Sequence, residues 1–292
     1  MISVQCIVES KDLLGEGPVW SSSEQMVYWL DIIQSKIHRY RLNDQFFATQ
    51  TYSERITAIA PTNKKEWIGL TAKEIVLLNP HNHHIKKIAT VESDRPCNRF
   101  NDGKADPQGR FWAGTMNEKE MDRAEGSLYR IDREFQIKKM ADGIPLCNGM
   151  DWSPDSRTMY LNQTFKYEIT AYDFDAKHGE ISNPRLFAKL DQKLGGGPDG
   201  LTVDSKGNVW CAQYGAAHVL GFSPHGELIK TIHLPVPNVT SCTFGGDNYE
   251  FLFITTARQE MQNHDLLQAP LSGSLFSCRP GVKGLPENVF LF

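Results

Sequence analysis

The 292-residue sequence lacks the features that mark several large classes of protein. No apolar segment approaches the roughly 20 residues that a membrane-spanning helix needs, so we expect no membrane partner. The opening decapeptide, MISVQCIVES, has no charged start, apolar run or small-residue cleavage site, so it is not typical of a signal peptide. The formal net charge is only −4 and no basic stripe occurs. This balance argues against nucleic acid or an anionic membrane as a partner.

Cysteine is scarce and scattered. No two cysteines form a Cys-x-x-Cys pair, and the six are Cys6, Cys97, Cys147, Cys211, Cys242 and Cys278. This spacing favours buried, reduced thiols in a cytoplasmic protein over a disulfide framework.

Several catalytic signatures are also missing. There is no Gly-x-Ser-x-Gly, so a serine nucleophile on a strand-to-helix elbow has no support. The glycine-rich stretch GGGPDG, residues 195–200, lacks the Lys-Ser/Thr of a phosphate-binding loop. The run HNHH, residues 81–84, lies in a polar segment that predicts a solvated turn rather than a metal site.

What the sequence does contain is a repeat with a period of 40 to 51 residues. Each copy begins with one residue ahead of a short apolar strand, then a turn rich in Asp, Pro, Ser, Gly and Asn, then a second strand. These six starting residues are termed the anchor residues: Glu16, Ile56, Asn101, Asn148, Asp199 and Thr240. At the same spacing from each anchor residue stands a large apolar residue: Val27, Trp67, Trp112, Met159, Trp210 and Phe251.

This period is typical of propeller blades of four strands. Segments such as SLYRID, EITAYDFD and AHVLGFS fit third or fourth strands of their blades. We therefore predict an all-β chain forming a single six-bladed β-propeller over residues 1–292. The strand near VQCIVE is expected to complete the last blade beside the C-terminal segment. The alternative is a β-sandwich whose internal similarity is accidental.

A propeller would bring the anchor residues together at one mouth of its central channel, because the first strand of each blade lines that channel. The ring would then hold two carboxylates, Glu16 and Asp199, and two carboxamides, Asn101 and Asn148. Carboxylates that face each other are unfavourable without a cation or hydrogen bonds. Oxygen ligands suit Ca²⁺, Mg²⁺ or Mn²⁺, with Zn²⁺ or Fe²⁺ also acceptable. The plainer alternative is four capped turns around a wet channel.

Such a ring has the parts for metal-assisted hydrolysis at a carbonyl group. A divalent cation polarises a carbonyl and acidifies water, and a carboxylate such as Asp199 can take the proton of that water and return it to the leaving oxygen. Glu16 would supply a second negative charge, Asn148 a neutral ligand, and Arg99 a donor fork for substrate oxygens. Asp102 and Lys104 are interpreted as turn-capping residues, and the recurring tryptophans as core.

Four segments, GEGPVW, RFNDGKADPQGRFWAGTM, NGMDWSPD and GPDGLTVD, resemble the signature segments of the SMP-30/gluconolactonase/regucalcin-like family, in the same order over nearly the whole chain. The resemblance implies a six-bladed propeller with one divalent metal ion in the channel, hydrolysing sugar lactones to aldonic acids. It also implies that Glu16, Asn148 and Asp199 are the metal ligands and that Asp199 donates and accepts the proton.

The resemblance further implies that Arg99 and Asn101 contact substrate hydroxyls. An additional acidic contact is expected just after the AGTM segment, where Glu118 is the nearest candidate. Strict counting places Lys119 there instead, and this departure from the family pattern leaves the identity of the sugar open.

The predicted function is therefore a metal-dependent sugar lactonase with a small-molecule substrate. Two other functions stay open: a non-enzymatic calcium-binding or protein-interaction propeller, and a different metal-dependent ester hydrolase on the same scaffold. An aryl-ester or phosphotriester hydrolase would favour an apolar mouth, whereas we expect a polar mouth formed by Arg99, Asn101 and Glu118. The sequence leaves monomer and weak dimer equally open.

Overall fold

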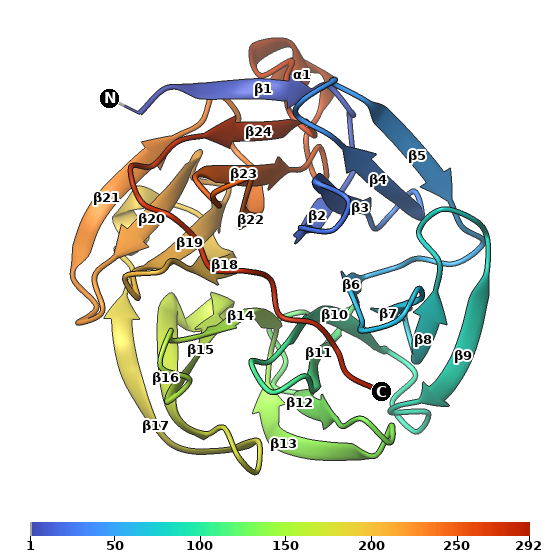
Figure 1. Cartoon of the computed structure of the whole chain (residues 1–292). Helices are drawn as coiled ribbons and strands as arrows, with labels where there is room; N and C mark the ends of the chain where they lie inside the picture. The colour runs from blue at the N-terminus through green and yellow to red at the C-terminus, as the bar shows by residue number, and fades with distance from the viewer. Residues whose placement is uncertain (1) are drawn as a thin grey trace.

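The computed structural model describes residues 2–292 and shows six four-stranded antiparallel sheets arranged in a ring around a central axis (Figure 1). Each sheet is one blade. The first strand of each blade lies nearest the axis and the last lies at the rim (Figure 1). The predicted fold class, an all-β six-bladed propeller, is confirmed.

Five blades are built from consecutive strands, which follow one another in chain order from the axis outward. Blades 1 to 3 comprise β2 (Gly15–Ser21), β3 (Met26–Asp31), β4 (Lys36–Tyr40) and β5 (Phe47–Thr51); β6 (Ala58–Ala60), β7 (Trp67–Leu70), β8 (Glu74–Leu78) and β9 (Ile85–Thr90); and β10 (Asn98–Ala105), β11 (Phe111–Asn117), β12 (Gly126–Ile131) and β13 (Ile137–Ile144). Blades 4 and 5 comprise β14 (Cys147–Trp152), β15 (Thr158–Gln163), β16 (Glu168–Asp175) and β17 (Glu180–Lys189); and β18 (Gly197–Val203), β19 (Val209–Tyr214), β20 (His218–Phe222) and β21 (Leu228–His233).

Blade 6 joins the two ends of the chain. It comprises β22 (Val239–Gly245), β23 (Phe251–Thr256), β24 (Leu275–Cys278) and, at the rim, β1 (Val4–Val8). The pairs Val4–Cys278 and Cys6–Phe276 place β1 antiparallel to β24. The predicted closure of the last blade by the N-terminal strand is confirmed, and it leaves no long exposed edge between the chain ends.

The burial pattern explains why these segments form strands. The inner strands carry mostly buried residues, and β3 and β19 are largely apolar runs packed on both faces. The rim strands, such as β9 and β21, are mostly exposed because one face meets solvent. All six recurring apolar residues of the repeat fall at or next to the start of second strands, and the tryptophans are core residues as predicted.

A turn motif sets the inner strands in place at the end away from the anchor residues. In blade 3, Trp112 donates its indole N–H to the buried carboxylate of Asp106 (2.9 Å). In blade 5, Trp210 does the same to Asp204 (3.0 Å). Each aspartate also accepts backbone N–H bonds of its own turn. The turns DPQGRFW and DSKGNVW are thus one satisfied polar unit.

The C-terminal segment, residues 279–292, crosses the central face from blade 6 toward blade 3 (Figure 1). It is fastened by Ser205 N–H to the carbonyl of Lys283 (2.9 Å) and by Leu291 N–H to the carbonyl of Gly109 (2.9 Å). Phe290 is fully buried in the core between blades 2 and 3. This segment covers the end of the axis opposite the anchor residues.

Across the described residues, helical structure is limited to three short elements: η1 (Thr164–Lys166), η2 (Gln192–Leu194) and α1 (Asn263–Gln268). Within residues 2–292, no helix has the length and apolar character needed to cross a membrane. All six cysteines are free, four of them buried and two half-buried.

Candidate functional site

Irregularities in the inner strands aim the anchor residues at the axis. In blade 4 the pairing skips from Cys147 to Met150, so Asn148 and its neighbour bulge out of the ladder. The same skip surrounds Asp199 in blade 5 and Asn101 in blade 3, and in blade 1 it begins directly after Glu16. A bulge redirects a side chain locally. Here four bulges turn four polar side chains toward one place.

Glycines next to two anchor residues allow the inner strands to approach closely. A Cβ on Gly149 would lie 2.4 Å from the backbone nitrogen of Leu201, and one on Gly200 would lie 2.0 Å from Oγ of Ser241. Any side chain at either position would push neighbouring blades apart. The small residue therefore lets Asn148 and Asp199 share one site.

Glu16 and Asp199 are the charged centre of the site. Burial raises the pKa of both carboxyls well above their ordinary values, and neighbouring carboxylates raise them further. Glu16 is raised by Asp199 and Asp102, and Asp199 by Asp102. Neither Glu16 nor Asp199 makes an ion pair with any residue between 2 and 292. Arg99 interacts electrostatically with Glu16 but forms no ion pair with it, so the repulsion between the two carboxylates is at most partly offset.

The two carboxamides complete this polar end. Asn101 donates from Nδ2 to Oδ1 of Asn148 (3.2 Å) and to the carbonyl of Cys147 (3.1 Å). Asn148 donates from Nδ2 to Oγ1 of Thr164 (3.2 Å), and its contact with Asp199 offsets part of the rise in that pKa. The amide oxygen of Asn148 accepts one bond, from Asn101, and can accept a second.

The donor set fits a hard divalent cation. Two carboxylates and one amide oxygen are ligands that Ca²⁺, Mg²⁺ and Mn²⁺ prefer, and a bound cation would relieve the repulsion between Glu16 and Asp199. In the described part of the chain, no group of three or more His, Cys, Asp or Glu side chains is placed to hold a metal ion. The amide of Asn148 is therefore an essential third ligand if the site holds a cation.

Arg99 lies at the mouth of the site and forms hydrogen bonds with three other residues. Its Nη1 donates to Oδ1 of Asn101 (3.0 Å) and to the carbonyl of Phe100 (2.8 Å), and its Nε donates to Glu118 (3.2 Å). Glu118 also binds Arg55. Burial opposes the ionisation of Glu118, but the hydrogen bonds from Arg55 and Arg99 outweigh it and lower its pKa. Glu118 thus reaches the site only through Arg99.

Lys119, the competing position, lies elsewhere. Its backbone N–H donates to Oδ1 of Asn117 (2.9 Å), and the residue lines a surface groove with Arg95, Cys97 and Arg123. Neither Glu118 nor Lys119 lines the cavity that contains Glu16, Asn148 and Asp199.

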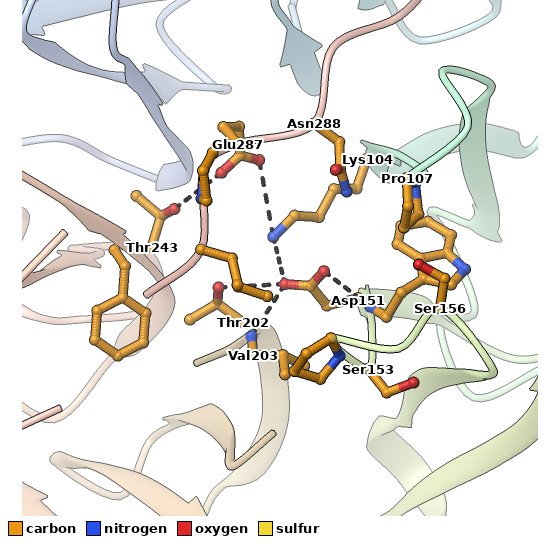
Figure 2. A pocket seen from close by; sticks show the side chains of 15 residues that line it. Lys104, Pro107, Asp151, Ser153, Ser156, Thr202, Val203, Thr243, Glu287 and Asn288 are labelled. Atoms are coloured by element: carbon orange, nitrogen blue, oxygen red, sulfur yellow. Dashed lines mark hydrogen bonds and ion pairs between the residues drawn. The ribbon is translucent and has the colours of Figure 1, made fainter. Parts of the chain in front are cut away.

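The interpretation of Lys104 as a turn cap is wrong, because Lys104 lies within β10 and points to the other end of the axis. Figure 2 shows its ammonium between Asp151 (2.8 Å) and Glu287 (3.8 Å), beneath the C-terminal segment. Asp102 does cap its own strand through Gly103 N–H (2.7 Å). It also lies deep enough for burial to raise its pKa to about 6, and its charge acts on the site.

The cavity above Glu16 and Asp199 has a volume of about 350 Å³. The sequence predicted a polar mouth. Arg99 and Asn101 line it as expected, but so do the apolar side chains of Met121, Leu146 and Phe165. These three come from loops between strands and an irregular turn, which carry no repeat pattern.

Two supporting residues were missed by reading the sequence. Asn162 is fully buried and donates from Nδ2 to the backbone carbonyl of Asp199, holding the bulge in place. Thr164 accepts from Asn148 and donates to the carbonyl of Pro198 (2.8 Å). Both lie at or beyond the end of a second strand, where the repeat gives no signal.

Comparison with known proteins gives a consistent result. Residues 14–258 match the family model described as the SMP-30/Gluconolactonase/LRE-like region. Regucalcin of Oryctolagus cuniculus is 33% identical over 291 residues, which cover 98% of this chain and 97% of the relative. A luciferin-regenerating enzyme matches with a TM-score of 0.93 and 29% identity, covering 100% of both chains. Regucalcin of Agrobacterium tumefaciens, described as a calcium-binding protein, matches with a TM-score of 0.92 and 26% identity, covering 99% of this chain and 97% of that one.

Proposed function

The chain belongs to the SMP-30/gluconolactonase/LRE-like family, as its sequence motifs predicted, and from that premise we propose that it is a metal-dependent lactonase. In this proposal it is a carboxylic-ester hydrolase that opens an aldono-lactone of the gluconolactone type to the aldonic acid. The observation that carries the proposal is the buried pair of Glu16 and Asp199, which forms no ion pair with the other described side chains and lies beside the amide of Asn148 at the base of a cavity.

Glu16, Asn148 and Asp199 would hold one divalent cation, with open positions toward the cavity. When bound, the cation would supply Lewis-acid polarisation of the lactone carbonyl and a lowered pKa for water. Calcium is favoured by the oxygen donors and by the similar regucalcin that is described as calcium-binding. Magnesium, manganese, zinc and iron(II) are the other candidates.

Asp199 is the residue that moves the proton. It would accept a proton from the attacking water as the new C–O bond forms at the lactone carbonyl, and would return it to the ring oxygen as the ring C–O bond breaks. The reaction consumes one water molecule and releases one hydroxy acid. Asn162 fixes the backbone of Asp199, so the carboxylate needs little reorganisation to act.

Arg99 and Asn101 would orient the substrate at the polar wall. Asn101 already aligns Asn148, and Arg99 is aligned in turn by Glu118. We propose a positioning role for Glu118, acting through Arg99. A cytoplasmic setting, proposed from the sequence, agrees with the six free cysteines.

The test is a pH-stat assay of acid release from a panel of aldono-lactones, with added divalent cations and with a chelator. Cation-dependent release that stops with the chelator supports the proposal. Chelator-insensitive hydrolysis would refute the metal-dependent mechanism, and no hydrolysis of any aldono-lactone with any cation would refute aldono-lactonase activity.

A second candidate is a non-enzymatic calcium-binding propeller. The observation in its favour is that Arg99 is already hydrogen-bonded within the protein and requires no substrate. It predicts calcium binding by calorimetry together with no turnover of any lactone.

A further inference from the structure

The cavity has two chemically distinct halves. Its buried end holds Glu16, Asn148 and Asp199, whereas its exposed rim carries the apolar side chains of Met121 and Phe165 beside Glu260. Both apolar residues are strongly exposed for their size: 41% for Met121 and 43% for Phe165. Leu146, which is half-buried, also lines the cavity. Single exposed apolar residues are ordinary, but several converging on one cavity with a polar base are typical of a ligand site.

The local backbone presents Phe165 to this cavity. Phe165 is the middle residue of η1, and the turn ends at Tyr167 in the left-handed conformation (φ 55°). Tyr167 closes the turn by donating its N–H to the carbonyl of Thr164 (3.1 Å) and accepts from Leu190 N–H (2.9 Å). A non-glycine residue at positive φ is held there only when its surroundings require it. Within residues 2–292, the ring of Phe165 stacks on no other aromatic side chain.

Several polar groups around the mouth are already hydrogen-bonded within the protein. Arg99 is bonded to Glu118 and Asn101, and the hydroxyl of Tyr214 donates to the carbonyl of Gln259 (3.2 Å). Oγ1 of Thr164 donates to the carbonyl of Pro198. The side chains of Gln259 and Glu260 also line the cavity, but a hydroxyl placed against the ring of Phe165 would lose its bonds to water.

We propose that this site selects a lactone that carries an apolar substituent, an alkyl chain or an aryl group, on its ring. The ring carbonyl lies at the polar base, and the substituent covers Met121, Leu146 and Phe165. This inference rests on the proposed lactonase function but assigns a different preferred substrate: a lactone with an apolar substituent in place of the hydroxylated one of an aldono-lactone. Met121 and Phe165 are its specificity-determining residues, and a volume of about 350 Å³ holds such a molecule.

The experiment compares γ-butyrolactone with γ-nonalactone, which differ only by a pentyl chain, and includes glucono-δ-lactone. Hydrolysis is measured for the wild type, Phe165→Ala, Met121→Ala and the double variant, with Phe165→Leu as the conservative change. Phe46→Ala is the matched control, since Phe46 is a 40% exposed aromatic residue in a different turn. We expect the wild type to prefer γ-nonalactone in kcat/KM by at least about tenfold, mainly through KM. Phe165→Ala should abolish most of that preference, Phe165→Leu should keep part of it, and Phe46→Ala should keep it whole.

Binding gives a second readout that needs no turnover. The two corresponding γ-lactams, with a ring N–H in place of the ring oxygen, resist hydrolysis and are titrated by calorimetry. The pentyl lactam should bind at least about tenfold more tightly than the unsubstituted one, and Phe165→Ala should close the gap.

The inference would be overturned if the wild type bound both lactams equally. It would also be overturned if the double variant kept the difference in affinity between them. Turnover of glucono-δ-lactone with no preference for γ-nonalactone would overturn it while leaving the lactonase function intact. If the pentyl lactam binds more tightly than the unsubstituted lactam but no lactone is hydrolysed, the lactonase function is refuted and an apolar-substituted ligand is still supported.

Discussion

Nδ2 of Asn101 lies 3.2 Å from Oδ1 of Asn148, and this bond joins the inner strands of blades 3 and 4 at the mouth of the cavity. It places the orientation of one proposed ligand under the control of a residue that the resemblance assigns to substrate. Asn101 therefore has two proposed roles, one toward the substrate and one toward Asn148.

Replacing Asn101 by alanine should affect both roles. Loss of a residue that orients a metal ligand typically weakens metal binding by about 10–100-fold. We expect the dissociation constant of the cation, measured by calorimetry, to increase. At saturating cation, the KM for the lactone should rise by a larger factor than kcat falls. Unchanged cation affinity would contradict the orienting role of Asn101.

Asp102 should make the metal-free protein less stable as pH rises. Burial raises its pKa from 3.8 to about 6, so the folded state holds a proton that the unfolded state releases. Stability is full below about pH 4 and is lost as pH rises to about 6, a penalty of about 3 kcal/mol. Asp102→Asn keeps an oxygen for Gly103 N–H and removes the charge. In a chelator, urea unfolding should show the variant as stable as the wild type near pH 4 and more stable at pH 7. Equal stability at both pH values would refute this.

Lys104 should stabilise the fold at the end of the axis opposite the anchor residues. Its ammonium is the cation for Asp151, and burial raises the pKa of Glu287 beside it. Lys104→Met leaves a buried carboxylate unpaired and should lower the free energy of unfolding by about 3–5 kcal/mol. Adding Asp151→Asn should recover part of that loss in the same denaturation experiment. An unchanged unfolding midpoint for the single variant would contradict the pairing.

Phe290 fastens the C-terminal segment. It is fully buried and packs on Phe135 and Phe292, with ring centroids 5.6 and 5.7 Å away. Phe290→Ala should cost about 3–5 kcal/mol of stability and lower Tm in a thermal melt. Because Phe290 lies far along the axis from Asp199, KM should stay at the wild-type value below the transition. A stable Phe290→Ala protein would show that the segment is not part of the core.

The sequence was sufficient to predict the fold and the centre of the site, because both depend on the repeat. Each of the six anchor residues falls in or just ahead of a first strand, and β1 completes the last blade. The repeat also predicts that Glu16, Asn148 and Asp199 come together, since equivalent positions in a propeller share one ring.

The rest depends on segments without a repeat. Phe165 and Met121 reach the cavity from an irregular turn and a loop, and Lys104 leaves the expected turn because β10 extends past it. Arg99 forms an ion pair with Glu118, and the conformation of the loop after β11 determines that Glu118, and not Lys119, lies beside it. Local composition specifies none of these contacts, because each joins residues whose spacing follows no period.

The central claim is that Asp199 carries the proton in lactone hydrolysis, and one measurement tests it most directly. Asp199→Asn preserves the shape of the side chain and one oxygen for the cation, and Gly200 keeps the close approach of the strands. The rate of lactone opening is measured at saturating cation, with binding of the cation confirmed by calorimetry and spontaneous hydrolysis subtracted. We predict that kcat falls by about 10²–10⁴-fold. A cation-loaded Asp199→Asn protein that hydrolyses lactone near the wild-type rate would contradict this role of Asp199.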